Sequence, residues 1–403
     1  MKKYLLVGLL ILALLLAACG GTTTPQTGGA ATATTGTETM EPTAEATEAT
    51  EVEATEEPTE EPTEEGTGSE EGAIATVCLV TDLGNVNDGT FNEFAYQGMV
   101  QAEEDFDLET TFIETQSETD YAKNIDTCVQ EAYDVIVTVG FLIADATLEA
   151  ATANPEIKFI GVDQFFEAPP ENLVGIQYRE DQGGFLAGAM ACMMTESDVV
   201  GGVYGIDIPP VKKFRSGFEN GCHYVNPDAN VLGVYVPSFI DPAAGASTAE
   251  QFLGEDADVI FGAGGPTGTG GIRNAAEQGV YVIGVDQDEF ESTFGGGDAP
   301  GADKILTSAI KRVDLGVYDQ LHGLADPSSG LWAGGGLYIL DAANEGITYA
   351  PFHDAEDAVP DAVKERLEEI RQLLASGDLE TGVDPVSGEI DEATMPEAVP
   401  FEP

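Results

Sequence analysis

The chain has 403 residues, of which 73 are Asp or Glu and 15 are Lys or Arg, so its formal net charge is −58. A field of this sign repels phosphate backbones and anionic membrane surfaces, which argues against nucleic acid as a partner. Residues 73–403 are long enough for two lobes with separate hydrophobic cores.

The first residues have the pattern of a secretory signal. Two lysines precede an apolar stretch from Leu5 to Leu16, which is shorter than the roughly 20 helical residues that span a bilayer. The run Leu16-Ala17-Ala18-Cys19-Gly20 resembles the lipobox of a bacterial lipoprotein. This resemblance implies a signal peptide over residues 1–19, diacylation of Cys19, and a lipid anchor at the extracytoplasmic face of the cell membrane. An ordinary secretory signal with an incidental cysteine is the alternative.

Residues 20–72 consist almost wholly of Thr, Glu, Ala, Gly, Pro and Ser. They contain no periodic pattern of large aliphatic side chains, so they cannot bury enough surface to fold. We predict a disordered acidic tether that spans roughly 40 Å root-mean-square, from about 5–6 Å times the square root of its length.

From Ile74 onward, short apolar strands alternate with amphipathic helices. The expected strands are Ala75–Val80, Glu109–Ile113, Val135–Val139, Lys158–Val162 and Leu173–Ile176. The expected helices between them are Phe91–Glu104, Tyr121–Ala132 and Ala144–Ala153. This alternation, with Val and Ile runs in the strands, predicts a parallel sheet covered on both faces. We assign residues 73–180 to a first lobe.

The pattern begins again after the glycine-rich helix Gly183–Met194. The next expected strands are Val199–Tyr204, Val231–Val236, Asp258–Phe261 and Val280–Val285, and the helices between them are Val211–Val225, Ala243–Leu253 and Gly271–Gln278. We assign residues 181–300 to a second lobe. Residues 301–377 should return to the first lobe through Asp303–Leu324 and end in the helix Pro360–Ala375, before an acidic tail over 378–403. The fold class is therefore α/β with two lobes, each a parallel sheet flanked by helices, and the ligand site is expected in the cleft between them.

The chain has four cysteines besides Cys19. Their even number in an oxidising compartment favours disulfides over free buried thiols. Three pairings are possible, and the lobe boundaries favour Cys78 with Cys128 and Cys192 with Cys222. No Cys-x-x-Cys spacing or Cys/His cluster supports a metal site.

Polar and aromatic residues that follow the strands are candidates for ligand binding. Thr90 is placed to cap the helix that Phe91 and Asn92 open. Phe91 is either a stacking platform or a packing contact that fixes the start of the helix. Asp163 and Asp286 each end an apolar strand, where a carboxylate can accept a hydrogen bond from a sugar hydroxyl or a base N–H. Helix capping or simple solvation is the alternative role for both.

Two further features have both a functional and a structural explanation. The run Gly262–Gly271 matches no phosphate-binding motif and contains no basic residue, so it is either a close backbone approach to an uncharged ligand or a surface loop. Lys311 is one of only nine lysines; it either bonds hydroxyls or neutralises Asp286, or it is a surface lysine.

No catalytic constellation is found in the sequence. The three histidines are scattered, and neither a Gly-x-Ser-x-Gly elbow nor a His-Glu-x-x-His motif is present. The sequence therefore predicts no enzyme activity, no cofactor and no metal.

Several short motifs occur in the order in which one protein family carries them. They are Val80-Thr81-Asp82, Asp88-Gly89-Thr90-Phe91-Asn92 with Gly98, Thr138-Val139-Gly140-Phe141, Phe185-Leu186-Ala187-Gly188, Phe214 with Gly217-Phe218, Ala257-Asp258-Val259-Ile260-Phe261, Gly264 to Gly270, Ile283-Gly284-Val285-Asp286 and Thr307-Ser308-Ala309-Ile310-Lys311-Arg312. Together they resemble the basic membrane protein family of ABC-transporter substrate-binding lipoproteins, which includes purine nucleoside receptors. The chain differs where family members often carry Asp-Lys-Ser-Phe-Asn and, soon after it, a tryptophan; Tyr96 stands in place of the latter.

The resemblance implies a periplasmic-binding-protein-like fold with a purine nucleoside in the interlobe cleft. The ligand-binding residues that it implies are Asp82, Phe91, Asn92, Asp163, Phe214, Gly264, Asp286 and Lys311. The two phenylalanines would sandwich the base, and Asn92 and Asp163 would contact its polar edges. Gly264, Asp286 and Lys311 would hold the ribose hydroxyls. Asp145 is an alternative to Asp163.

The resemblance also implies a function and partners. The protein would deliver its ligand to the permease and ATPase subunits of an ABC importer, as a monomer held to the membrane by lipid. A nucleoside or small-polar-ligand sensor without transport, and a nucleoside-cleaving enzyme, are the alternatives.

Overall fold

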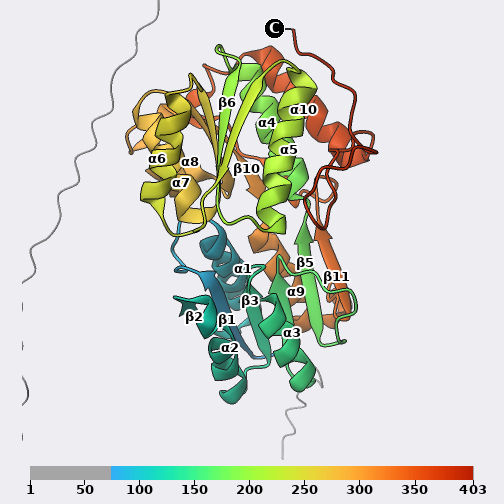
Figure 1. Ribbon diagram of the computed structural model, residues 1–403. Coiled ribbons are helices and arrows are strands. Elements are labelled where there is room, and N and C mark those ends of the chain that lie inside the picture. Colours follow the sequence, from blue (N-terminus) through green and yellow to red (C-terminus); the bar gives the residue numbers. More distant parts are fainter. Residues whose placement is uncertain (1–73, 403) are drawn as a thin grey trace, which may run out of the picture. The chain divides into compact units, whose positions relative to one another are not determined.

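The computed structural model describes residues 74–402; the predicted signal peptide and tether lie outside them. The strands of this part form two six-stranded sheets, each flanked by helices (Figure 1). The first sheet has the strand order β11-β5-β4-β3-β1-β2. Its members, all parallel, are β1 (Thr76–Leu83), β2 (Glu109–Thr115), β3 (Val135–Val139), β4 (Lys158–Val162), β5 (Leu173–Tyr178) and β11 (Gly336–Leu340).

Helices cover both faces of this first sheet. They are α1 (Phe91–Phe106), α2 (Tyr121–Gln130), α3 (Ala144–Ala153) and α9 (Val313–Ala325). Successive side chains of a strand point to opposite faces of the sheet. In β1, Val77 and Leu79 pack in one core with residues of α1 and α9, while Cys78 and Val80 pack in another with residues of α2 and α3. The predicted parallel sheet with two buried faces is therefore confirmed.

The second sheet has the order β12-β10-β9-β8-β6-β7. Its strands are β6 (Val199–Tyr204), β7 (Asn230–Tyr235), β8 (Val259–Ala263), β9 (Tyr281–Asp286), β10 (Ile305–Lys311) and the antiparallel β12 (Ile347–Tyr349). The helices of this lobe are α4 (Glu180–Met194), α5 (Pro209–Val225), α6 (Pro242–Leu253), α7 (Gly265–Glu277), α8 (Glu289–Ser292) and α10 (Asp361–Ser376). One core contains residues of α4, α5 and α10, and another contains residues of α6 and α7.

The predicted return of residues 301–377 to the first lobe is wrong for much of this segment. Strand β10 pairs with β9 in the second sheet, and every one of its residues is buried there. Only α9 and β11 belong to the first lobe; β12 pairs with β10, and α10 packs in the core of α4 and α5. The chain thus passes between the sheets at β5–α4, β10–α9 and β11–β12. Backbone hydrogen bonds join these passages. The N–H of Arg179 donates to Leu340 O, and the N–H of Arg312 donates to Gly346 O, both in the β11–β12 passage.

The glycine-rich run after β8 is mostly helix and not the expected loop. Helix α7 begins at Gly265, six residues before its predicted start. Its glycines allow close packing on α6, since a Cβ on Gly270 would lie 2.2 Å from the carbonyl oxygen of Pro242. Small residues are therefore needed here for helix packing. Helix propensity alone disfavours glycine in a helix, so it does not predict a helix over this run.

Both predicted disulfides are present. Cys78–Cys128 joins β1 to α2 in the first lobe, and Cys192–Cys222 joins α4 to α5 in the second. The Cα atoms of the two pairs are 6.0 and 5.1 Å apart.

The acidic tail packs along α5. Asn220 Nδ2 donates to Thr381 O at 2.8 Å, Ser216 Oγ donates to Gly388 O at 2.7 Å, and the N–H of Val399 donates to Tyr224 O at 2.8 Å.

None of the helices within residues 74–402 has the length and apolar character that a membrane-spanning helix requires.

Candidate ligand-binding site

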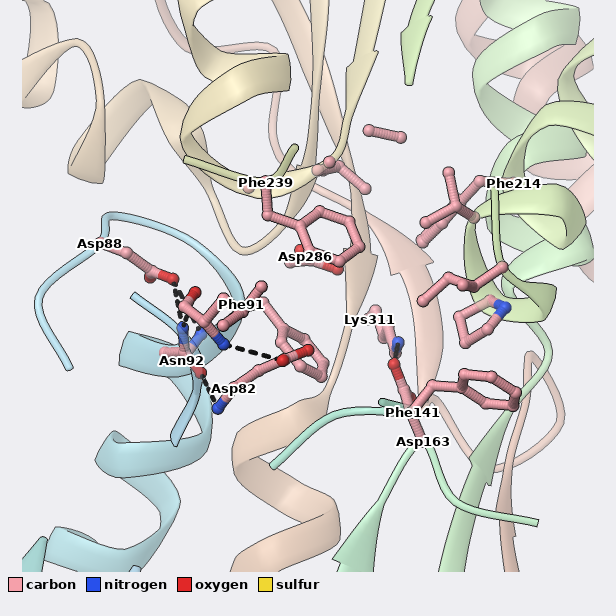
Figure 2. Close-up of a pocket in the computed structure, with 18 of the residues that line it drawn as sticks. Asp82, Asp88, Phe91, Asn92, Phe141, Asp163, Phe214, Phe239, Asp286 and Lys311 are labelled. Atoms are coloured by element: carbon pink, nitrogen blue, oxygen red, sulfur yellow. Dashed lines mark hydrogen bonds and ion pairs between the residues drawn. The ribbon is translucent and has the colours of Figure 1, made fainter. Parts of the chain in front are cut away.

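A pocket lies where the carboxyl ends of strands from both sheets meet. It contains about 600 Å³ of empty space, counting the part that is open to solvent. All eight predicted ligand-binding residues line it, from Asp82 and Asp163 on the first lobe to Asp286 and Lys311 on the second (Figure 2). Asp145 does not line it and is exposed on α3. The geometric reason is general: parallel strands present their carboxyl ends, and the loops that follow, at one edge of the sheet.

The β1–α1 loop is held by its own side chains. Asp88 caps α1: its Oδ1 accepts from the backbone N–H of Thr90 at 2.9 Å and of Glu93 at 3.2 Å. Asn92 Nδ2 donates to Asp88 Oδ2 at 3.1 Å, and Asn92 Oδ1 accepts from the N–H of Asp82 at 3.0 Å. Thr90, the expected cap, makes no side-chain cap bond. The amide of Asn92 is therefore engaged in shaping the wall of the pocket.

Asp82, near the end of β1, is bonded in a similar way. Its Oδ1 accepts from the N–H of Leu83 at 2.7 Å and from the hydroxyl of Tyr121 on α2. Burial raises the pKa of Asp82 to about 6, against the opposing effect of these bonds. This carboxyl thus serves the scaffold of the first lobe as well as lining the pocket.

Asp286, at the end of β9, is different. It is 6 % exposed, and no residue in the described part of the chain donates a hydrogen bond to its carboxylate. The loop that follows is held instead by Glu289, which accepts from the N–H of Val285 at 3.1 Å and from the hydroxyl of Thr293 at 2.7 Å. Burial raises the pKa of Asp286 to about 7, although Lys311 acts in the opposite direction. The carboxyl of Asp286 is therefore available to a donor in the pocket.

Lys311 is the one basic residue that lines the pocket. Its Nζ lies 2.6 Å from Asp163 Oδ2 and 2.9 Å from Glu180 Oε1, and 4.8 Å from the ring centre of Phe91. Burial lowers the pKa of Lys311, but the two carboxylates outweigh it and hold the pKa above its usual value. Burial raises the pKa of Asp163 to about 6, against the effect of Lys311. The only ammonium in the pocket is thus already paired, which leaves no free cation for a phosphate.

Four aromatic rings line the pocket from both lobes. Phe91 opens α1 and Phe141 follows β3 in the first lobe; Phe214 lies on α5 and Phe239 follows β7 in the second. Sequence reasoning did not select Phe141, Phe239 or Asp88 as site residues. Phe141 directly follows a buried strand and a glycine, which is a usable signal, whereas the loop that contains Phe239 carries none.

Gly264 lies between β8 and α7. A Cβ at this position would be 2.3 Å from the backbone N of Gly205, so no larger residue fits. The glycine is needed for the close approach of two loops at the rim of the pocket.

The chemistry of the site suits an uncharged ligand with a flat ring and several hydroxyl or N–H groups. Rings offer stacking surfaces, and the carboxylates of Asp82, Asp88, Asp163 and Asp286 offer acceptors. No cluster of three or more His, Cys, Asp or Glu side chains within residues 74–402 is arranged to hold a metal ion.

Two α/β lobes joined by three passages, with a pocket between their strand ends, define a two-lobed solute-binding protein. Residues 75–380 match the Bmp family, described as ABC transporter substrate-binding protein PnrA-like. The chain belongs to this family, which is one of substrate-binding proteins rather than enzymes.

Relatives are found in several bacteria. The CD4+ T-cell-stimulating antigen of Listeria monocytogenes is 31% identical over 319 residues, covering 75% of this chain and 87% of the relative. Basic membrane protein A of Borreliella burgdorferi is 33% identical, covering 64% of this chain and 75% of the relative. The ABC transporter nucleoside-binding protein BmpA of Lactococcus lactis is 29% identical, covering 74% and 87% respectively.

Solved structures share the fold. A solute-binding protein of an ABC transporter system from Aeropyrum pernix superposes with a TM-score of 0.67 at 24% identity, covering 76% of this chain and 92% of that one. One from Conexibacter woesei gives 0.60 at 24% identity, covering 78% and 99%.

Proposed function

We propose that this protein is an extracytoplasmic lipoprotein that binds a purine nucleoside between its lobes and delivers it to the permease of an ABC importer. The observation that carries the proposal is one pocket in which aromatic rings from opposite lobes accompany an unbonded, buried carboxylate, that of Asp286. Membership of the Bmp family supports the transport class, and the relative from Lactococcus lactis is named for nucleoside binding.

The base is proposed to stack between Phe91 and Phe214. Stacking of a base on an aromatic side chain contributes about 1–3 kcal/mol in nucleic-acid binders. Asp163 Oδ1 is buried and has no hydrogen-bond partner in the described part of the chain, so it suits an N–H of the base. We assign Asn92 to the shape of the base-binding wall, since its amide is bonded within the loop.

The ribose is proposed to lie against Asp286, Lys311 and the backbone at Gly264. Hydroxyl groups would donate to the free carboxylate of Asp286 and accept from Lys311. A nucleotide should bind poorly because the only ammonium of the pocket is paired with Asp163 and the carboxylates would repel a phosphate.

Calorimetric titration of the full chain tests this proposal. Inosine, guanosine and adenosine should bind, while 2′,3′-dideoxyinosine and hypoxanthine should bind much more weakly, because a site built for hydroxyls is left with unpaired polar groups. Phe91→Ala and Phe214→Ala should each weaken nucleoside binding by about 1–3 kcal/mol. Inosine monophosphate that binds as tightly as inosine would overturn the nucleoside assignment.

The lipid anchor is proposed from Cys19 and its flanking residues alone. The Cys19→Ser variant should carry no acyl chain by mass spectrometry, and its affinity for ligand should be unchanged because residues 20–72 separate the cysteine from the lobes. Acyl chains on the variant would contradict the proposal. Co-purification with permease and ATPase subunits would separate transport from ligand sensing.

A further inference from the structure

Two charged side chains behind the pocket neither line it nor reach solvent. Glu180 opens α4 and is fully buried, and Lys213 lies on α5 with 2 % of its surface exposed. Glu180 Oε2 pairs with Lys213 Nζ, and Glu180 Oε1 lies 2.9 Å from Lys311 Nζ. With Asp163, 2.6 Å from Lys311, they form a buried charge chain: Lys213, Glu180, Lys311 and Asp163.

A charge chain of this kind is costly to bury. Removing each ion from water carries a penalty of several kcal/mol, and apolar residues of similar volume often replace buried ion pairs without loss of stability. The signs alternate along this chain, so each inner charge has two opposite neighbours. Lys213 Nζ also donates to Tyr178 O at 2.8 Å. A buried ion pair is therefore weak evidence of a purely structural role. Because this charge chain ends at the pocket, its position points to a role there.

The buried charge chain connects the passages between the lobes to the pocket. Glu180 directly follows the passage from β5, and Lys311 ends β10 directly before the passage to α9. Lys213 precedes Phe214, the aromatic residue that α5 contributes to the pocket. Asp163 belongs to the first lobe, so the charge chain joins both lobes beside the passages between them.

We infer that Glu180 is a positioning residue for ligand binding, held in place by Lys213, that fixes the ammonium of Lys311 against Asp163 Oδ2. An ammonium has three N–H donors. Two oxygens, from Glu180 and Asp163, lie within reach of Lys311, which leaves one N–H for the ligand. With its Oδ2 occupied, Asp163 keeps Oδ1 for the ligand. The inference rests on the proposed function for the identity of the ligand, but the ordering of Lys311 does not depend on it.

The charges that face Lys311 make the role testable by pH. They come from Asp163 directly after β4, Glu180 on α4, Asp286 on β9 and Lys213 on α5; the phenol of Tyr178 on β5 lies nearby. Without the charge of Glu180, Lys311 loses one anion and faces an uncompensated Lys213. The pKa of Lys311 should then fall, and ligand affinity should decrease above pH 8, where the affinity of the wild-type protein should no longer change.

The Glu180→Gln variant tests this in the full chain, with inosine as the probe. Its affinity at pH 7 should be about 10- to 100-fold weaker, the range found for partners that orient a ligating side chain in metal sites. Its affinity should fall further at alkaline pH. Asp181→Asn is the matched control: Asp181 is the next residue of α4, is equally buried, and pairs with Arg179 at 2.7 Å, away from Lys311. This control should bind inosine as the wild type does, with the same pH profile.

A ligand-free measurement separates this inference from the proposed function. In protein labelled with 15N-lysine, the ammonium of Lys311 should give a signal protected from exchange, identified by its loss in Lys311→Met, and Glu180→Gln should abolish it. If the wild type binds no nucleoside, the proposed function fails and this signal still decides the inference.

A second variant covers a failure of Glu180→Gln to fold. Glu180→Gln with Lys213→Met removes one buried charge of each sign; it should bind inosine as weakly as the single variant, with a smaller alkaline decrease because no uncompensated Lys213 remains. Wild-type affinity and pH profile in either variant, retention of the Lys311 signal, or an equal loss in Asp181→Asn would overturn the inference.

Discussion

The same five residues, Ile-Gly-Val-Asp-Gln, stand at equivalent places in the two lobes. Ile160–Gln164 begins in β4 and Ile283–Gln287 begins in β9, and each of these strands is fourth from the β2 or β7 edge of its sheet. Both aspartates have a left-handed backbone, with φ of 61° for Asp163 and 66° for Asp286, and both line the pocket. The local sequence therefore produces the same turn twice.

The two aspartates nevertheless have different partners. Lys311 lies on β10, whose Ile310 is in register with Asp286, yet its ammonium pairs with Asp163 in the other lobe. Asp286 is left without a hydrogen bond in the described part of the chain. One aspartate thus joins the lobes, and the other remains an acceptor for the ligand.

The two glutamines differ in the same manner. Gln164 is fully buried, and its Nε2 donates to Thr138 Oγ1 at 3.0 Å and to Gly140 O at 3.1 Å, within its own lobe. Gln287 Nε2 donates to Thr90 O of the other lobe at 3.5 Å. Identical local sequences therefore bond within one lobe or between the lobes, depending on what the rest of the fold places beside them.

Exchanging each aspartate for asparagine should give the largest difference in stability between the two sites. Asparagine is the suitable replacement because it tolerates the same left-handed backbone conformation. Asp163→Asn breaks a buried ion pair and should lower the free energy of unfolding by about 3–5 kcal/mol. Asp286→Asn should leave that free energy unchanged or higher, but should weaken nucleoside binding by about 1.5–3 kcal/mol, the value of a hydrogen bond to a charged group. Urea unfolding and calorimetry measure the two effects; equal losses of stability would remove the distinction between the aspartates.

Substituting the glutamines should give a smaller contrast. Gln164→Ala removes buried hydrogen bonds to Thr138 and Gly140 and should lower the free energy of unfolding by about 1–3 kcal/mol. Gln287→Ala removes one long hydrogen bond and should weaken ligand binding by about 1 kcal/mol or less, with little change in stability. A larger stability loss for Gln287→Ala, measured by urea unfolding, would contradict the assignment of Gln164 to the scaffold.

The effect of pH should be the smallest and the most diagnostic. The pKa of Asp286 is raised to about 7, so at this carboxyl the folded protein binds more protons than the unfolded chain between about pH 4 and 7. The free energy of unfolding without ligand should therefore decrease as pH rises through this range. Nucleoside affinity should instead increase towards pH 8, because ionised Asp286 is the better acceptor for a hydroxyl.

Asp286→Asn is the control for this pH prediction. It should flatten the rise in affinity and reduce the loss of stability between about pH 4 and 7. Titrations at several pH values check both trends. A wild-type affinity that falls as the pH rises would show that the ligand does not donate to this carboxylate.

The sequence by itself determined much of the site. Alternating apolar and amphipathic runs have a period set by the backbone, so the strands, helices and strand ends are readable locally. This is why the pattern alone predicts Asp163 and Asp286 as carboxylates at strand ends, and why the lobe boundaries pair the cysteines correctly. A resemblance carried by short motifs added Phe214, which local patterning did not distinguish from a core residue.

Only the tertiary structure decided which sheet each late strand joins and which charges meet. β11 and β12 are short strands whose partners, β5 and β10, lie far away in the sequence, so pairing depends on where the chain crosses between lobes. Glu180 and Lys213 look like solvated helix residues in the sequence, because charge pattern alone does not reveal burial. Asp163 and Asp286 share one local sequence, and they differ because a side chain's partner is set by the whole fold, while its backbone conformation is set by its neighbours.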